Sequence, residues 1–261
     1  MDFLMSNVFL KVDILLLVFV RFLGLFVTSP VFGGRNVPNY SKIGFSLIIS
    51  TLLLSVKQNI TVSYDNHVIG YALLIMKELI IGMLLGFVVY LILSVFYLAG
   101  QLIDYQIGFT MVSVMDPLSQ IQVPVTGNFY YLLVLILFLI RNGHHKLIQA
   151  LFYSYDVLPI GEAVFTNQLT GSYIHIVANS FVIAFKIASP FITVVLILDV
   201  ALAVLARTVP QLNMFVVGLP LRLLLGLACL FIVASLLSSI FSYVSNELFS
   251  ELFKVIKGLI P

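Results

Sequence analysis

Residues 21–44 read RFLGLFVTSPVFGGRNVPNYSKIG, and this stretch decides the class of fold. It begins with a charged residue, Arg21, inside an apolar run, and Pro30 and Gly33 then break that run before a short polar loop. Proline and glycine end or kink helices. An interruption of this kind has little use in a soluble core. It indicates a membrane protein whose helices are broken and packed against neighbouring polypeptide.

The composition of the whole chain supports this class. Of the 261 residues, 61% are hydrophobic and only 9% are charged, whereas a soluble domain carries about 25% charged residues. The net charge is +2, and no basic block is present that a nucleic acid would bind. The single cysteine, Cys229, lies in an apolar run and offers neither a disulfide nor a cysteine metal site. We expect an all-α, polytopic protein that resides in a lipid membrane.

Six apolar segments are candidates for helices, and their lengths are uneven. They are residues 8–33, 43–56, 68–99, 128–140, 173–206 and 214–245. A helix needs about 20 apolar residues to cross the hydrocarbon core. Some segments are too short for a simple crossing and others are too long, so the sequence predicts about six long, tilted or kinked helices. The amphipathic tail, residues 246–261, predicts an interfacial helix end.

Charged residues inside the apolar segments should face protein or water. They are Arg21, Lys77, Glu78, Lys186, Asp199 and Arg222. A bare charge at the centre of the bilayer costs about 2.5–3.5 kcal/mol even on the most lenient scale. Arg21 and Arg222 could avoid this cost by snorkelling to the interface. Lys186 and Asp199 flank Pro190 and are too far apart to pair on one straight helix, so each should pair with another helix or with another chain.

Gly82 and Gly86 form the motif GMLLG on the third apolar segment. Two small residues at this spacing lie on one helix face and allow two backbones to approach closely. The pair therefore predicts close helix packing, within the chain or with a neighbour.

Residues 100–127, GQLIDYQIGFTMVSVMDPLSQIQVPVTG, combine helix breakers with apolar side chains. Three glycines and two prolines argue against a continuous helix. Irregular backbone at membrane depth is tolerated only where protein buries it or where it lines a cavity. Two interpretations follow: an interfacial segment that merely packs, or a hydrophobic constriction that closes a pore. The composition by itself favours the first.

No arrangement typical of an enzyme is found. HExxH, GxSxG, a P-loop and GxGxxG are all absent from the sequence. His144 and His145 are neighbours in a polar stretch, and adjacent histidines do not share a helix face. We predict no catalytic residue, no metal and no cofactor.

Residues 21–44 resemble the corresponding sequence of the FliR family of flagellar type III export-gate proteins. The injectisome counterparts of this family are the SctT proteins. Three more stretches match: KELIIGMLLGFVVY (77–90), AGQLIDYQIGFTMVSVMDP (99–117) and ARTVPQLNMFVVGLPLRLLLG (206–226). The resemblance extends over almost the whole chain, and its last stretch is specific enough to separate the chain from a generic permease.

The resemblance implies a non-enzymatic subunit of the flagellar export gate, in the bacterial inner (cell) membrane at the flagellar basal body. Its partners would be FliP-like and FliQ-like gate subunits, with FlhB-like and FlhA-like proteins beside them, and its cargo would be unfolded flagellar subunits. It implies one export-gate domain, residues 1–261, with a FliP-like part (about 1–170) and a FliQ-like part (about 171–261). The helices would form tilted hairpins around a channel.

The resemblance also assigns roles to residues. Members of the family close their channel with an internal loop, and this changes the preferred interpretation of residues 100–127 from interfacial segment to plug. The residues expected at the seal are Ile107, Phe109, Met111, Val112, Val114 and Met115. Sharp turns that set the hairpin geometry are expected in residues 32–38 and 207–214. The residues of the matching motifs to which the resemblance gives a structural role are Arg21, Pro30, Gly33, Arg35, Pro38, Arg207, Pro210, Asn213, Gly218 and Pro220.

Two alternatives stay open. An injectisome export-gate subunit would use the same mechanism for another cargo. A stand-alone solute permease is less well supported, because no pair of interrupted helices at matching positions suggests an inverted repeat.

Overall fold

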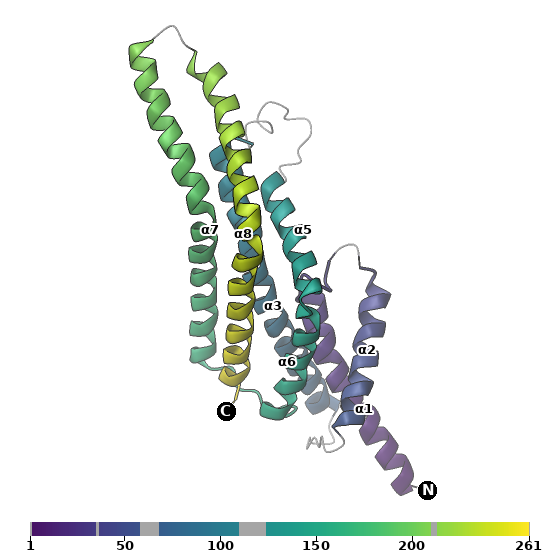
Figure 1. Cartoon of the computed structure of the whole chain (residues 1–261). Helices are drawn as coiled ribbons and strands as arrows, with labels where there is room; N and C mark the ends of the chain where they lie inside the picture. The colour runs from purple at the N-terminus through teal and green to yellow at the C-terminus, as the bar shows by residue number, and fades with distance from the viewer. Residues whose placement is uncertain (1, 35–36, 58–67, 110–123, 210–212, 261) are drawn as a thin grey trace. The chain divides into compact units, whose positions relative to one another are not determined.

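The computed structural model describes residues 2–34, 37–57, 68–109, 124–209 and 213–260. These residues form helices and no strand, so the predicted all-α class is confirmed (Figure 1). The helices are α1 (Asp2–Thr28), α2 (Asn39–Val56), α3 (Val68–Ile107), α5 (Val125–Ile140), α6 (Gly143–Val157), α7 (Asn167–Thr208) and α8 (Met214–Gly258).

Several helices are long and apolar enough to cross a membrane. Among the described residues these are α2, α3, α7 and α8, and the pair α5 and α6, bent by 68°, would make a fifth span. The polytopic membrane class predicted from composition is therefore confirmed. Pro190 lies inside α7 and Pro220 inside α8, and both helices continue past these prolines.

The helix boundaries differ from those expected in three places. Helix α3 continues to Ile107 and α5 begins at Val125, so the non-helical region is narrower than residues 100–127. Helix α8 continues beyond residue 245, where the apolar segment was expected to end, to Gly258, and it includes most of the amphipathic tail. The polar stretch around His144 and His145 is not a loop but the first turn of α6.

The sequence does carry a signal for α6. Its buried residues Leu147, Ala150, Leu151 and Ser154 follow the i, i+3, i+4, i+7 spacing of an amphipathic helix. The first turn of α6 is polar, and polar residues separate its apolar ones. A search for long apolar runs therefore does not find this helix. A helix with one polar face lacks the hydropathy of a membrane span.

The chain divides into two compact units. Unit 1 comprises Met1–Ile92, Asn142–Ile176 and Glu247–Pro261, and unit 2 comprises Leu93–Arg141 and Val177–Asn246. Helices α3, α7 and α8 contribute residues to both units. Each unit is considered separately below.

An aromatic cluster holds the turn after α1 in unit 1. The ring of Phe26 lies 4.6 Å from that of Phe32 and 5.2 Å from that of Phe45, measured between ring centroids. Phe32 belongs to the turn and Phe45 to α2, so the cluster joins the two helices across the turn. Pairs of aromatic rings at this separation add to the free energy gained by burial. The two helices pack against each other over this turn.

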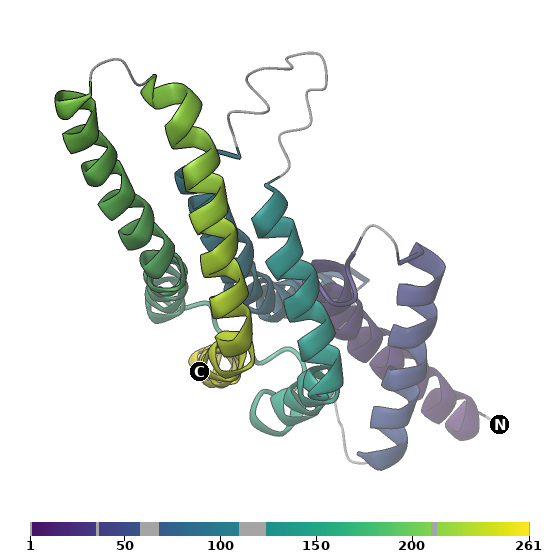
Figure 2. The ribbon, with the colours of Figure 1, turned by 45° about the horizontal axis from the view of Figure 1, so that its top comes forward.

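Helices α7 and α8 form an antiparallel pair in unit 2, where they run side by side in both views (Figures 1 and 2). Asp199 of α7 accepts a hydrogen bond from Arg222 Nε of α8 at 2.8 Å. At the end of α5, Arg141 donates hydrogen bonds to the hydroxyls of Ser238 and Ser242 of α8. Polar contacts thus tie α8 to two neighbouring helices.

Candidate functional site

The most deeply buried charges of unit 1 form an ion pair between α1 and α3. Arg21 Nε donates a hydrogen bond to Glu78 Oε2 at 2.5 Å, and both side chains are 0% exposed. Arg21 was expected to snorkel, and that expectation is wrong. A buried charge is tolerated when it is paired and hydrogen-bonded, and Glu78 supplies the partner that makes burial of Arg21 possible.

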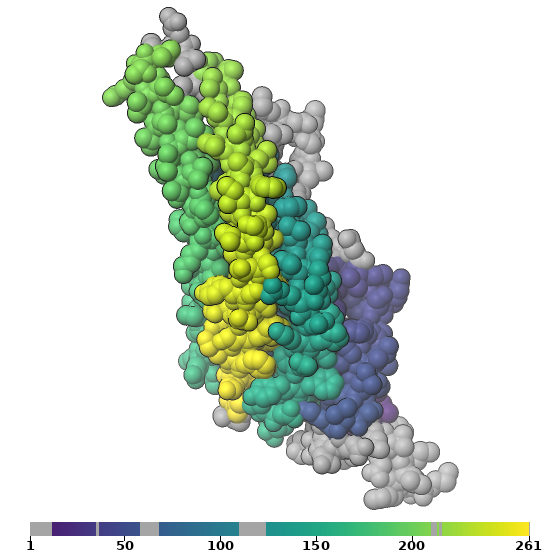
Figure 3. All heavy atoms as spheres, in the orientation of Figure 1, coloured from purple at the N-terminus to yellow at the C-terminus, as the bar shows by residue number. Residues whose placement is uncertain are grey.

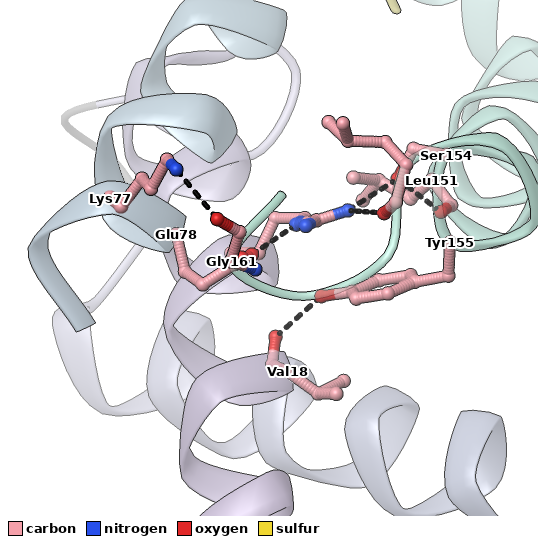
Figure 4. A network of polar contacts seen from close by, with 9 residues as sticks. Val18, Lys77, Glu78, Leu151, Ser154, Tyr155 and Gly161 are labelled. Carbon is pink, nitrogen blue, oxygen red and sulfur yellow. Dashed lines mark hydrogen bonds and ion pairs between the residues drawn. The ribbon is translucent and has the colours of Figure 1, made fainter. Parts of the chain in front are cut away.

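The same guanidinium also binds α6 and the residue that follows it (Figure 4). Arg21 Nη1 donates to the hydroxyl oxygen of Ser154 at 3.2 Å and to the carbonyl oxygen of Leu158 at 3.4 Å. The guanidinium lies 4.0 Å from the centre of the Tyr155 ring, and the Tyr155 hydroxyl donates to the carbonyl oxygen of Val18 at 3.4 Å. One arginine therefore connects α1, α3 and α6.

Glu78 and its neighbour Lys77 form hydrogen bonds with the turn that follows α6. The second carboxylate oxygen of Glu78 accepts a hydrogen bond from the Gly161 N–H at 3.0 Å, and Lys77 Nζ donates to the Gly161 carbonyl at 2.6 Å. Gly161 has φ +85°, a conformation that side chains disfavour. The two adjacent charges of α3 thus bind both polar groups of one residue (Figure 4).

Three glycines let α1 and α3 approach closely beside this ion pair. A Cβ atom at Gly82 would overlap the carbonyl group of Arg21, and one at Gly86 would lie 2.8 Å from the carbonyl oxygen of Leu25. On the facing helix, a Cβ at Gly24 would lie 2.7 Å from the carbonyl oxygen of Leu79. The structure thus places Gly82 and Gly86 against a helix of the same chain. Gly24, on α1, was missed because the residue at that spacing is Thr28 and not a second glycine.

A buried aspartate marks the non-helical region in unit 2. Asp104, near the end of α3, is 1% exposed, and its two carboxylate oxygens accept the N–H of Thr126 at 3.2 and 3.1 Å. Thr126 lies in the first turn of α5, where N–H groups lack helical partners and a negative charge is favourable. Asp104 therefore joins the helices on either side of residues 108–124.

Close backbone packing reinforces this connection. A Cβ atom at Gly100 would overlap the backbone of Gly127, and one at Gly127 would lie 2.9 Å from the Tyr97 carbonyl oxygen. The sequence identified Gly100 and Gly127 only as helix breakers. Both lie where two helices cross. A single sequence does not show whether a glycine ends a helix or allows two helices to pack closely.

The residues expected at a channel seal fall in different places. Ile107 is the last residue of α3, is 0% exposed, and its side chain lies against Gly226 of α8. Phe109 lies in the turn that follows and is partly exposed. Met111, Val112, Val114 and Met115 lie outside the described residues.

Most residues of the predicted structural motifs lie in the part of the chain that the structure describes. Gly33 donates its N–H to the Ser29 carbonyl at 2.6 Å and accepts from Lys42 Nζ at 3.1 Å, and Pro38 immediately precedes α2. The Asn213 carbonyl accepts the N–H groups of Val216 and Val217 at the start of α8. The remaining residues are Pro30 in the turn after α1, Arg207 in the last turn of α7, and Gly218 and Pro220 within α8, while Arg35 and Pro210 lie outside the described residues.

The charged residues of α7 and α8 differ in whether they form an ion pair within the described part of the chain. Asp199 pairs within the chain with Arg222, and both side chains are about one-third exposed, at 35% and 38%. Lys186 is exposed, and no described acidic side chain forms an ion pair with it. The described residues contain no group of three or more His, Cys, Asp or Glu that could hold a metal ion.

The sequence is similar to those of bacterial export proteins. A family model described as "Bacterial export proteins, family 1" matches residues 12–248. The chain is 36% identical over 250 residues to the flagellar biosynthetic protein FliR of Bacillus subtilis, which covers 94% of this chain and 93% of that protein. It is 31% identical over 242 residues to FliR of Escherichia coli, covering 92% and 90%.

A third relative has a different name. The surface presentation of antigens protein SpaR of Shigella flexneri is 31% identical over 220 residues, covering 84% of each chain. The match to the family model runs through both units and includes every stretch on which the resemblance rests. The chain belongs to family 1 of the bacterial export proteins, the family of the flagellar biosynthetic protein FliR.

Proposed function

We propose that this chain is a non-enzymatic subunit of the flagellar type III protein export gate, in the bacterial inner membrane at the basal body. The observation that carries the proposal is the 36% identity to a flagellar FliR over 94% of the chain. The arrangement of the described side chains supports it, because the buried charges of Arg21, Glu78 and Asp104 bind other parts of the same chain and form structural connections between helices.

Assembly with FliP-like and FliQ-like subunits would form the channel through which unfolded flagellar subunits pass, next to FlhB-like and FlhA-like proteins. Exposure of apolar surface supports an assembly. In the most apolar stretch of α3, 56% of the residues are buried within the chain, against 28% for α7 and 17% for α8. Residues 1–170 would correspond to the FliP-like part and residues 171–261 to the FliQ-like part.

The end of α3 and the segment that follows it would close the channel, with Ile107, Phe109, Met111, Val112, Val114 and Met115 at the seal. A plug must keep its position. The connection of Asp104 to Thr126 supports this role because it joins the helices on either side of the segment. The contact of Ile107 with Gly226 supports it because it holds the end of α3 against α8.

Deletion of the gene in the source bacterium tests the proposal. Without the chain, we expect flagellar subunits to disappear from the culture medium and cells to lose motility, and a plasmid copy should restore both. A tagged chain should co-purify with the FliP-like and FliQ-like proteins. Normal flagella in the deletion strain would refute the proposal, and a purified chain that is stable alone and transports a solute would favour a permease.

The injectisome is the second candidate, and the similarity to SpaR favours it. The mechanism would be the same and only the cargo would differ. The proteins that vanish from the medium of the deletion strain decide between the two: hook and filament subunits for a flagellar gate, other secreted proteins for an injectisome gate.

A further inference from the structure

Helix α7 carries a lysine on an exposed apolar face in unit 2, and no acidic side chain in the part of the chain that the structure describes forms an ion pair with it. Lys186 is exposed, and the other charge of this part of the helix, Asp199, is already paired with Arg222. At helical spacing from Lys186 lie Val182, Ile197 and Val200, which are 49%, 62% and 58% exposed. The upper part of α7 (green) lies at the surface in the space-filling view (Figure 3). This face needs a cover that is apolar and also compensates a positive charge.

Lipid alone does not satisfy this face. Exposed large apolar side chains extend along α7 from Ile174 to Leu205, and Lys186 lies between them, about 18 Å along the helix from Ile174 and about 28 Å from Leu205 at 1.5 Å per residue. A charge with apolar residues on both sides of it along the helix is costly against hydrocarbon. Protein is therefore expected to contact this face at Lys186.

The backbone next to Lys186 is satisfied, so the ammonium is the remaining polar group. Pro190 has no N–H, which leaves the Lys186 carbonyl without its helical donor. The hydroxyl of Ser189 donates to this carbonyl at 2.8 Å in place of the missing bond. Because intramembrane charges are costly and pair with one another, the group that faces Lys186 should be a carboxylate.

We propose that the α7 face formed by Val182, Lys186, Thr193, Ile197 and Val200 docks an apolar helix of another subunit, and that this helix places an aspartate or glutamate against Lys186. The inference rests on the proposed function, because the partner would be another subunit of the export assembly. It deepens that function by stating the chemistry of the partner surface: apolar side chains with one carboxylate at the depth of Lys186.

Charge substitutions test the docking surface in whole cells. Lys186→Glu should place like charges together and reduce co-purifying subunits and secreted flagellar subunits by about tenfold or more. Lys186→Arg keeps the charge and should retain both within about twofold. Lys257→Glu is the matched control, because Lys257 is exposed near the end of α8 and undergoes the same change of charge. The amount of each variant in the membrane is measured by immunoblot.

Photo-crosslinking tests the same surface with Lys186 in place, so that a poorly folded variant does not decide the outcome. A benzoylphenylalanine at Val182 should crosslink to another membrane subunit, and mass spectrometry should place the adduct within about one helical turn of an Asp or Glu. The same amino acid at Phe191, which is 0% exposed, should label only this chain.

Two results would overturn the inference. One is Lys186→Glu assembling and exporting like the unchanged chain. The other is crosslinks from position 182 only to lipid, only to this chain, or to a helix without a carboxylate near the adduct. The proposed function fails separately, when deletion of the gene leaves export intact, so the two failures are distinguishable.

Discussion

At the scale of single residues, the Arg21–Glu78 pair has the largest expected effect on stability in unit 1. Removing one member of a buried ion pair leaves the other charge uncompensated and costs about 3–5 kcal/mol. We expect Glu78→Ala to lower the unfolding temperature of the detergent-solubilised protein strongly and to reduce its amount in membranes. Replacing both charges, as in Arg21→Met with Glu78→Leu, should recover part of the loss, because apolar pairs of similar volume are often tolerated at such sites.

An exposed ion pair provides the control for this experiment. Asp156 pairs with Lys57 and its side chain is 60% exposed. Surface pairs contribute little to stability, so Asp156→Asn should leave the unfolding temperature nearly unchanged. Equal effects of Glu78→Ala and Asp156→Asn would contradict the role assigned to burial.

At the scale of helices, the close approach of α1 and α3 predicts opposite effects for two glycine substitutions. Alanine is favoured over glycine in a helix by about 1 kcal/mol. At Gly82 this gain is outweighed, because the new Cβ would overlap the carbonyl group of Arg21. At Gly44 of α2 no atom lies within 4 Å of the new Cβ. Thermal unfolding should therefore show Gly82→Ala to be destabilised and Gly44→Ala to be unchanged or stabilised, and a stabilised Gly82→Ala would contradict the packing.

The connection between α3 and α5 predicts a local change in amide protection. Asp104→Ala removes the acceptor of the Thr126 N–H, and a buried N–H without a partner costs about 1–3 kcal/mol. Hydrogen exchange of the first turn of α5 should become faster. Asp104→Asn keeps one carbonyl oxygen and should have a smaller effect, and unchanged exchange in both variants would show that Asp104 does not hold the start of α5.

The proposed plug predicts a conducting channel when its apolar side chains are removed. With Phe109, Met111 and Met115 replaced by Gly or Ser in the assembled gate, the constriction should admit water. Membranes should then leak ions, measured as conductance or as loss of the proton gradient. Unchanged conductance in a normally assembled complex would remove the plug assignment.

At the scale of the whole molecule, exposed apolar surface predicts dependence on partners. Binding to the folded state stabilises it by mass action, by about 2.7 kcal/mol at a partner concentration of 100 times Kd. The chain produced alone should therefore unfold at a lower temperature and associate more readily in detergent than the chain co-produced with FliP-like and FliQ-like subunits. Size-exclusion chromatography and thermal unfolding measure both properties, and identical behaviour with and without partners would contradict the prediction.

The sequence alone determined the class of the protein and its family. Hydropathy and helix breaking by proline and glycine are local properties of the sequence. They are therefore sufficient to predict an all-α membrane protein with interrupted helices. The stretches 21–44 and 206–226 are specific enough to identify the FliR family, which the similarity to known proteins confirms. Helix boundaries were less certain, because α3 runs past Gly100 and α6 mixes polar and apolar residues.

Only the tertiary structure decided which charges meet. An ion pair depends on the distance between two side chains, and Arg21 and Glu78 are 57 residues apart in sequence. Arg21 therefore looked like a residue that could reach the interface, and its burial became evident only once α1, α3 and α6 were packed together. The same reason applies to Asp104, Gly100 and Gly127, whose partners lie across a helix crossing that no local pattern of residues specifies.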